Sequence, residues 1–279
     1  MRLWISSVLL LSASAAPVAG PVVNDGYGDY CYVPAGAFKM GDNFGDGEAR
    51  ERPVHTVELD AFYIAKYETT NGEWRKFRDD PGYEDKKFWP NGWVVPKDQI
   101  PYWTDARNHG GGTPDSDAYP VLGVNWDSAT AYCNWLSAKT GKKYRLPTEA
   151  EWEKAARGTD QRRYPWGNDI DHSHANYVGA AAFDTGAPVG SYKGDVSPNG
   201  VFDMGGNVME WCADWYARDY YAVSPRKNPQ GPATGSYRVI RGGSFFLEAF
   251  DLRTYARSAA WPSFQAHRMI GFRAVREIS

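Results

Sequence analysis

The richest concentration of chemically useful side chains begins at Arg241, which is followed directly by a Gly-Gly pair. Ser244, Glu248, Asp251 and Arg253 alternate there with phenylalanines and leucines. A charge beside apolar side chains must be paired or solvated, because burial of an unpaired charge is costly. Consecutive glycines let the backbone approach another group closely or adopt positive φ. The stretch therefore predicts either a pocket that contains a carboxylate or a surface strand with ordinary ion pairs.

A second group of side chains is rich in oxygen and runs from Asp203 to Glu210. Asp203, Asn207 and Glu210 supply side-chain oxygens, and the glycines at 205–206 allow carbonyl groups to turn inward. Calcium prefers about six to eight oxygen ligands of this kind. The alternative is a hydrogen-bonded turn ahead of a buried Trp211.

Other reactive side chains support weaker hypotheses. His172 and His174 could place two imidazoles on one side of a strand as copper or zinc ligands, and the alternative is a solvated loop. Ser244 lacks the Gly-x-Ser-x-Gly context of many serine hydrolases. The sequence contains no phosphate-cradling or dinucleotide-binding motif.

The elements that would position these groups can be predicted from start and stop signals. Alternating apolar and polar residues predict a half-buried strand over 54–59. Capping boxes open helices after Thr70 and Thr148, since a glutamate follows each threonine three residues later. Another helix spans 125–141 and ends at a glycine. Residues 79–119 have no clear period and predict a long irregular excursion.

The N-terminal residues 1–19 have the features of a secretion signal: a positive start, a short apolar run and a small-residue cleavage site. That run is too short to span a membrane, and no later segment is apolar enough to do so. We expect a soluble protein that is exported to the periplasm or secreted. Cys31, Cys133 and Cys212 are compatible with one disulfide plus a free thiol, or with small buried hydrophobic residues.

Composition favours one aromatic-rich globular domain. The 279 residues carry a net charge of −3, so nothing suggests nucleic acid as a partner. The chain contains 12 Trp, 18 Tyr and 12 Phe together with 29 Gly and 18 Pro, which is typical of a loop-rich fold anchored by large rings. It contains no internal repeat and no evident linker.

Read together, the motifs resemble the formylglycine-generating enzyme (sulfatase-modifying factor) family. They occur in the order of that family and cover the chain from residue 28 to its end. The matching segments include Pro34-Ala-Gly-Ala-Phe-Lys-Met-Gly41, Tyr144-Arg-Leu-Pro-Thr-Glu-Ala-Glu-Trp-Glu153, Gly206-Asn-Val-Met-Glu-Trp211, Arg241-Gly-Gly-Ser244 and Gly271-Phe-Arg273. The resemblance implies a single domain over 28–279 with an α+β, C-type-lectin-like fold that is poor in regular secondary structure.

The resemblance also implies that bound calcium stabilises the fold at two sites. One site falls on Asp203, Gly206, Val208 and Glu210, where Gly206 and Val208 contribute carbonyl oxygens. The other falls on Asn176, the carbonyl of Tyr177, and Asp184.

The catalytic residues of the family are where this chain departs from it. The family oxidises a substrate cysteine with oxygen and copper, and it needs two cysteines after Arg-Gly-Gly-Ser. Leu247 and Leu252 occupy those positions here, and Met209 replaces the usual tryptophan. Thiolates are soft ligands that hold Cu(I), whereas leucine offers no ligand atom. We therefore expect neither copper binding nor formylglycine formation.

Two classes of function remain open. Members of an exported branch without the cysteine pair are implicated in pyoverdine maturation. Similarity to them implies an oxidoreductase that acts on a peptide or small molecule such as a siderophore precursor. Glu248 would then be the general acid or base, Arg253 or Arg241 would orient an anionic group, and Ser244 lies beside them. The alternative is a non-catalytic, calcium-stabilised lectin-like module that binds a peptide, glycan or protein.

Overall fold

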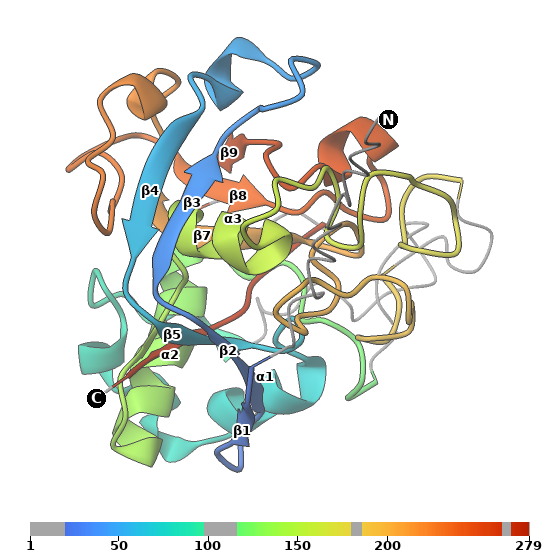
Figure 1. The fold of residues 1–279 in the computed structure, drawn as a ribbon. Helices are drawn as coiled ribbons and strands as arrows, with labels where there is room; N and C mark the ends of the chain where they lie inside the picture. The colour runs from blue at the N-terminus through green and yellow to red at the C-terminus, as the bar shows by residue number, and fades with distance from the viewer. Residues whose placement is uncertain (1–19, 98–115, 180–185, 264–268, 279) are drawn as a thin grey trace, which may run out of the picture.

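A computed structural model describes residues 20–97, 116–179, 186–263 and 269–278. The expected signal peptide and Asp184 lie outside the described residues. Regular elements in the described part are short and are joined by long loops, and they mix helices with sheets (Figure 1). The α+β class predicted from the sequence is confirmed.

Three sheets form the framework, and most of their pairings are antiparallel. The five-stranded sheet has the order β1 (Val22–Asn24), β2 (Asp29–Val33), β5 (Phe62–Ala65), β11 (Val275–Glu277) and β6 (Tyr144–Arg145). The four-stranded sheet has the order β10 (Ile270–Gly271), β7 (Met209–Trp215), β8 (Arg238–Arg241) and β9 (Ser258–Ala260). A ribbon of β3 (Gly36–Met40) and β4 (His55–Leu59) completes the set, and β4 confirms the strand predicted over 54–59.

The helices begin where the capping signals predict. In α1 (Asn71–Arg78) the Thr70 side chain accepts from the Glu73 N–H, and the Glu73 carboxylate accepts from the Thr70 N–H. The same reciprocal pair opens α3 (Glu149–Arg157). Helix α2 (Trp126–Thr140) ends at Gly141, whose φ is +69°. Single 3₁₀ turns occur as η1 (Ala49–Glu51), η2 (Pro81–Glu84), η3 (Lys86–Phe88), η6 (Tyr220–Ala222) and η7 (Ala249–Leu252).

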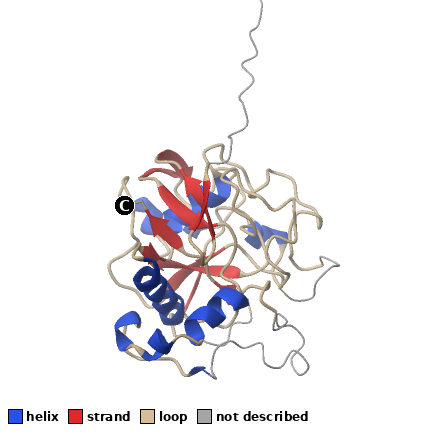
Figure 2. Ribbon diagram, turned by 90° about the horizontal axis from the view of Figure 1, so that it is seen from below, coloured by secondary structure: helices blue, strands red, loops and turns tan. Residues whose placement is uncertain are grey.

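The aromatic residues fill the core between these elements. Helices α1 and α2 pack together at one end of the molecule, where they bury Trp74, Phe77, Tyr132 and Trp135 (Figures 1 and 2). Helix α3 is buried along its whole length and contacts β3, β4, β7 and β8. Two of its glutamates, Glu149 and Glu153, are therefore held in the interior, where they pair with Arg241 at the end of β8.

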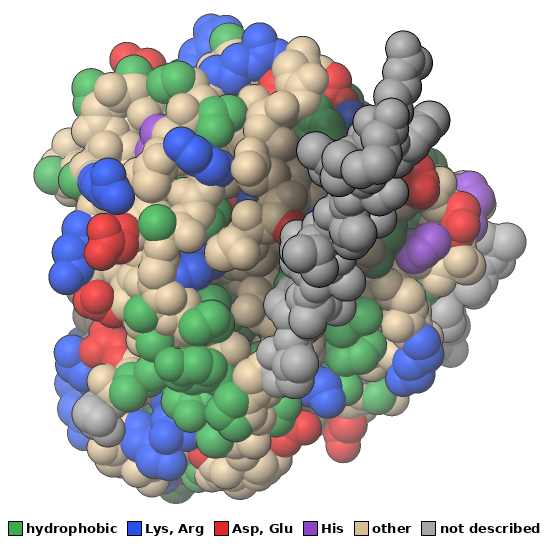
Figure 3. Space-filling model, viewed as in Figure 1, with side chains coloured by type: hydrophobic (Ala, Val, Ile, Leu, Met, Phe, Trp, Pro, Cys, Tyr) green, Lys and Arg blue, Asp and Glu red, His purple; other side chains and the backbone are tan. Residues whose placement is uncertain are grey.

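The surface mixes charges of both signs. On the face seen in Figure 3, Lys and Arg side chains are interspersed with Asp and Glu, and apolar side chains gather into a patch on its lower part. No helix in the described residues is long and apolar enough to cross a membrane.

Candidate active site

A depression of about 160 Å³ opens where β8 ends. Its walls come from η1, the start of β7, the end of β8 with the glycine pair, and residues 247–258. The charged stretch that stood out in the sequence therefore lines a pocket.

The glycine pair brings the wall of this depression close to the strand. Gly242 and Gly243 have φ of +101° and +72°, conformations that side-chain-bearing residues rarely adopt. A Cβ on Gly243 would lie 2.7 Å from Leu252 Cδ1 and 3.1 Å from the Asp251 carbonyl oxygen. Glycine at this position thus allows η7 to pack against the end of β8, and that packing sets the position of Asp251.

A buried network of ion pairs forms the floor. The Arg241 guanidinium lies 2.6 Å from Glu153 and 3.2 Å from Glu149, and Arg257 lies 2.7 Å from Glu149. All four side chains are almost fully buried, and both glutamates come from α3. The Arg241 guanidinium is fully buried and paired with both glutamates, although Arg241 also lines the depression, so its contact with a substrate stays a prediction.

Arg253 and Ser244 also lie inside the protein. Arg253 pairs with Glu51 at 3.4 Å and with Asp46 at 3.3 Å, and its guanidinium lies 3.6 Å from the centre of the Phe250 ring. Ser244 is fully buried, and its hydroxyl accepts a hydrogen bond from the backbone two residues later at 3.3 Å. These contacts assign both residues to the support of the wall.

The two carboxylates of this stretch have different surroundings. Glu248 is exposed and is not among the residues that line the depression, whereas Asp251 is half-buried on its wall. Burial raises the pKa of Asp251, while the Glu248 N–H and the charges of Arg253 and Arg50 oppose that shift. The geometry therefore favours Asp251 over Glu248 as the carboxylate that can meet a bound molecule.

The two leucines at the family's cysteine positions differ from one another as well. Leu247 is partly exposed on the wall of the depression, and Leu252 is fully buried in a cluster with Tyr164, Ala175 and Tyr177. Hydrocarbon side chains supply no ligand for Cu(I), so the residues at these two positions do not fit the copper site of the family.

The cysteines elsewhere in the chain are separate buried thiols, which corrects the disulfide hypothesis. Cys31 lies on β2, Cys133 on α2 and Cys212 on β7, and all are free. Burial raises the pKa of Cys31 to about 11 and that of Cys133 to about 12. Their role is that of small core residues.

The turn predicted to bind calcium is buried against the glycine pair. Asp203 adopts φ of +58°, and its carboxylate accepts from the Gly190 N–H at 2.6 Å. The Gly206 N–H donates to the Gly242 carbonyl at 2.8 Å. Asn176 belongs to the same region, because its carbonyl accepts from the Asn207 N–H at 2.8 Å. The structure thus brings together members of both predicted sites.

The buried carboxylates around Asp203 carry negative charge that would suit a bound cation. Glu68, Asp195, Asp203 and Glu210 are all buried, yet only Glu210 has an ion-pair partner in the described residues, namely Arg273 at 2.7 Å. One oxygen of Asp195 is buried without a hydrogen-bond partner in that part of the chain. Burial raises the pKa of Asp203 to about 6. Hard oxygen donors with excess negative charge suit calcium.

The geometry of the side chains limits that fit. No three His, Cys, Asp or Glu side chains converge on a single metal position in the described residues. Both oxygens of Glu210 are already used, by Arg273 and by the Trp152 indole at 2.9 Å. Carbonyl oxygens would therefore have to complete a site centred on Asp203.

The rings of His172 and His174 both stack on neighbouring aromatic rings. His172 stacks on Tyr177 with ring centroids 4.5 Å apart, and His174 stacks on Trp166 at 5.2 Å. His174 also lies 3.0 Å from a carboxylate oxygen of Asp171. Both histidines lie in turns between α3 and β7, as the loop interpretation predicts.

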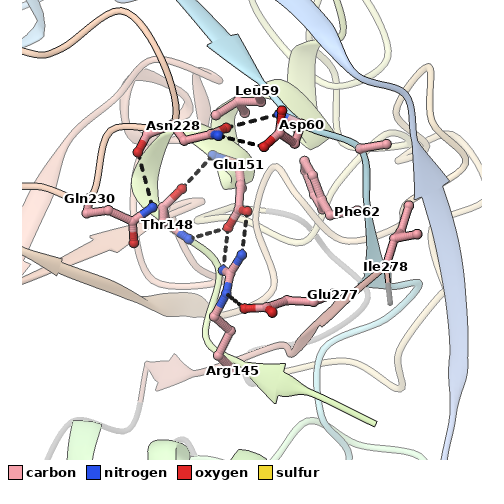
Figure 4. Close-up of a pocket in the computed structure, with 11 residues that line it drawn as sticks. Leu59, Asp60, Phe62, Arg145, Thr148, Glu151, Asn228, Gln230, Glu277 and Ile278 are labelled. Carbon is pink, nitrogen blue, oxygen red and sulfur yellow. Dashed lines mark hydrogen bonds and ion pairs between the residues drawn. The ribbon is translucent and has the colours of Figure 1, made fainter.

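A second depression, of about 260 Å³, lies beside the C-terminal strand (Figure 4). Its polar groups contact one another. Arg145 forms hydrogen bonds of 2.6 and 2.7 Å to Glu151 and one of 3.0 Å to Glu277. Asn228 donates to Asp60 at 2.8 Å. Glu151 is also the capping residue of α3, so this cavity is built by groups that hold the helix in place.

Sequence reasoning missed part of the first depression. Arg50 and Glu51 line it, although they lie roughly two hundred residues before Asp251 in the chain. They belong to an acidic loop with no periodic signal. Within that loop the Asp42 carboxylate accepts hydrogen bonds from the N–H groups of Phe44, Gly45 and Gly47.

Comparison with known proteins agrees with this architecture. The family model for the sulfatase-modifying factor enzyme 1-like domain matches residues 17–278. A formylglycine-generating enzyme of Streptomyces coelicolor is 35% identical over 288 residues, covering 88% of each chain. Hercynine oxygenase of Mycolicibacterium smegmatis is 34% identical over 249 residues, covering 81% of this chain and 56% of its own. The chain spans only 38% of a longer relative, serine/threonine-protein kinase pkn1 of Chlamydia caviae, at 37% identity over 253 residues and 88% of this chain.

Among solved structures, PvdO from Pseudomonas aeruginosa has a TM-score of 0.77 at 29% identity, covering 94% of this chain and 99% of that one. The fold is therefore that of the formylglycine-generating enzymes. The protein belongs to the sulfatase-modifying factor family.

Proposed function

We propose that this protein is an exported oxidase that acts on a peptide whose reactive group enters the depression at the end of β8. One observation carries the proposal: the family's catalytic stretch still forms a pocket, and a carboxylate lines it although both cysteines are leucines. The similarity to PvdO and to a hercynine oxygenase supports oxidative chemistry. The N-terminal signal features support export.

The reaction we propose is a two-electron dehydrogenation. The substrate loses two hydrogen atoms, and dioxygen accepts both electrons and both protons to become hydrogen peroxide. A carboxylate on the wall removes one proton, and the apolar walls exclude water from the reacting group. By analogy with the exported branch of the family, we propose a reduced siderophore precursor of the pyoverdine type as the substrate.

The test is aerobic incubation of the purified protein with such a precursor peptide. Mass spectrometry should show loss of two hydrogen atoms from the peptide, with one hydrogen peroxide formed per turnover. Heat-inactivated protein is the control for spontaneous oxidation. Equal product with active and inactivated protein would refute the proposal for this substrate. Formylglycine formation on a sulfatase peptide would instead show that the family reaction survives without the cysteines.

We also propose that calcium is a structural cofactor of this protein. Asp203 would be the central ligand, with the carbonyls of Gly206 and Val208, and Asp195 supplies further negative charge. Asn176 and Tyr177 would contribute from the adjoining loop. Elemental analysis of the purified protein should find calcium, and a chelator should lower the melting temperature. Protein that contains no calcium and is insensitive to chelator would contradict this.

The non-catalytic alternative has one observation in its favour. Phe246 and Phe250 are 68% and 44% exposed beside the depression, as expected of a surface that docks a partner. A binding module would hold the precursor peptide and leave its mass unchanged, so the same incubation distinguishes the two functions.

A further inference from the structure

We propose that the depression selects a small ring that carries a protonated nitrogen, and that Asp251 is the group that binds this nitrogen. The inference rests on the proposed function in one respect: it takes the depression to be the substrate site. It adds the chemical class of the group that enters and the residue that recognises it.

The charges around the depression point to a cation. Five ionisable side chains line it, and four of them have partners: Arg50 with Glu48 at 3.0 Å, Glu51 with Arg253 at 3.4 Å, Arg241 with Glu153 at 2.6 Å, and Arg257 with Glu149 at 2.7 Å. Asp251 has no ion-pair partner within 4 Å in the described part of the chain. Arg253 and Arg50 act on Asp251 only beyond ion-pair distance. The side chain on the wall without a close ion-pair partner is therefore negative.

The size and lining of the depression point to a ring. Its volume of about 160 Å³ is close to that of an apolar cavity, about 150 Å³, that accepts benzene in another protein. Met209, Ile240, Leu247 and Phe250 form apolar walls. Apolar walls beside one carboxylate that lacks a close ion-pair partner best accommodate a flat hydrocarbon body that carries a single positive group.

The position of Asp251 is fixed by the backbone. Its N–H donates to the Glu248 carbonyl at 2.9 Å within η7, and Gly243 lets that turn lie against the strand. The backbone that carries this carboxylate is therefore fixed before any ligand arrives, which lowers the entropic cost of binding. The exposed Glu248, three residues earlier, lies outside the slot and offers a matched control.

The experiment uses three probes that share one ring: benzylamine, which is protonated at pH 7, neutral benzyl alcohol, and anionic benzoate. Ligand-observed NMR titrations against the full protein at pH 7 and low salt give the dissociation constants. Three variants are compared with wild type. Asp251→Asn removes the charge on the wall, Glu248→Gln removes a charge outside it, and Leu247→Trp fills the slot.

We expect benzylamine to bind wild type at least about tenfold more tightly than benzyl alcohol, because a hydrogen bond between charged groups outweighs a neutral one by about that factor. Benzoate should bind most weakly. The tenfold preference should disappear in Asp251→Asn, persist in Glu248→Gln, and give way to loss of all binding in Leu247→Trp. Far-ultraviolet circular dichroism of each variant confirms that it is folded.

Equal affinities for the three probes, a preference for benzoate, or an unchanged preference in Asp251→Asn would overturn the inference. Benzoate as the tightest probe would show that Arg50 leaves Glu48 to bind an anion. These results do not depend on turnover. A preference for benzylamine without peptide oxidation would therefore refute only the proposed function, and oxidation without the preference would refute only this inference.

Discussion

The depression at the end of β8 and the one beside the C-terminal strand differ in whether their charged side chains are paired. In the larger one, Arg145, Glu151 and Glu277 satisfy one another, and the cavity is a by-product of capping α3. In the smaller one, the charges beneath are paired while Asp251 on the wall is not. The comparison teaches that an unmatched group, and not the volume of a cavity, marks a site that can recognise a ligand.

The largest loss of unfolding free energy should come from a substitution in the floor of the smaller depression. Glu153→Gln leaves Arg241 and Arg157 buried without their shared partner, so unfolding free energy should fall by about 3–5 kcal/mol. Glu277→Gln, in the larger depression, removes partly exposed pairs and should cost less than about 1 kcal/mol. Urea denaturation measures both. Similar losses in the two variants would remove the distinction between a buried and a solvated network.

Removal of calcium should loosen the smaller depression and leave the larger one unchanged. The turn around Asp203 is hydrogen-bonded to Gly242 through Gly206, so loss of the ion should loosen residues 241–252. We expect a chelator to lower the melting temperature by about 4 °C or more, which corresponds to about 1–2 kcal/mol for a domain of this size. Hydrogen exchange should accelerate in that segment and stay constant around Arg145. Uniform acceleration, or none, would count against the local coupling.

Gly243→Ala tests how the wall is built. It introduces a Cβ at φ of +72° with a 2.7 Å contact to Leu252, and it should cost about 1–3 kcal/mol. Gly45→Ala is the matched control, because φ is +78° there and nothing lies within 4 Å of the new Cβ. Thermal unfolding should show a larger loss at Gly243, together with weaker benzylamine binding. Equal losses would mean that backbone strain alone sets the cost.

The smallest effect on stability should come from Asp251→Asn. Burial raises the pKa of Asp251, so the folded state holds its proton more tightly than the unfolded chain does. Its contribution to stability is therefore lost as pH rises from the ordinary value near 3.8 through the raised value. Above that range the variant should equal wild type or exceed it by less than about 0.5 kcal/mol. Marked destabilisation at pH 7 would reveal a structural partner and contradict the account of Asp251.

Local signals in the sequence predicted much of the framework. The capping boxes at Thr70 and Thr148 are confirmed because each depends on side chains three residues apart, and the strand over 54–59 is confirmed because its alternation matches burial on one face. The glycine pair marked the depression correctly, since only glycine tolerates both the positive φ and the contact with η7.

The roles within the site depend on contacts between distant parts of the chain. The sequence alone does not predict that Arg241 lies in the floor, because its partners Glu149 and Glu153 come from the distant helix α3. Glu248 and Asp251 are equivalent in the sequence, and only the turn of η7 places one outside the depression and the other on its wall. Glu51 pairs with Arg253, and the Arg50 carbonyl accepts from Arg257. No local pattern predicts these contacts, because they join segments that are far apart in the chain.

We propose that a peptide is oxidised in the smaller depression and that Asp251 is the general base. The most direct measurement compares the turnover number of wild type, Asp251→Asn and Glu277→Gln on the reduced precursor peptide, followed by hydrogen peroxide release. A general base contributes at least about a hundredfold, so Asp251→Asn should lose that factor while Glu277→Gln stays within about threefold of wild type. Full turnover in Asp251→Asn would contradict the account.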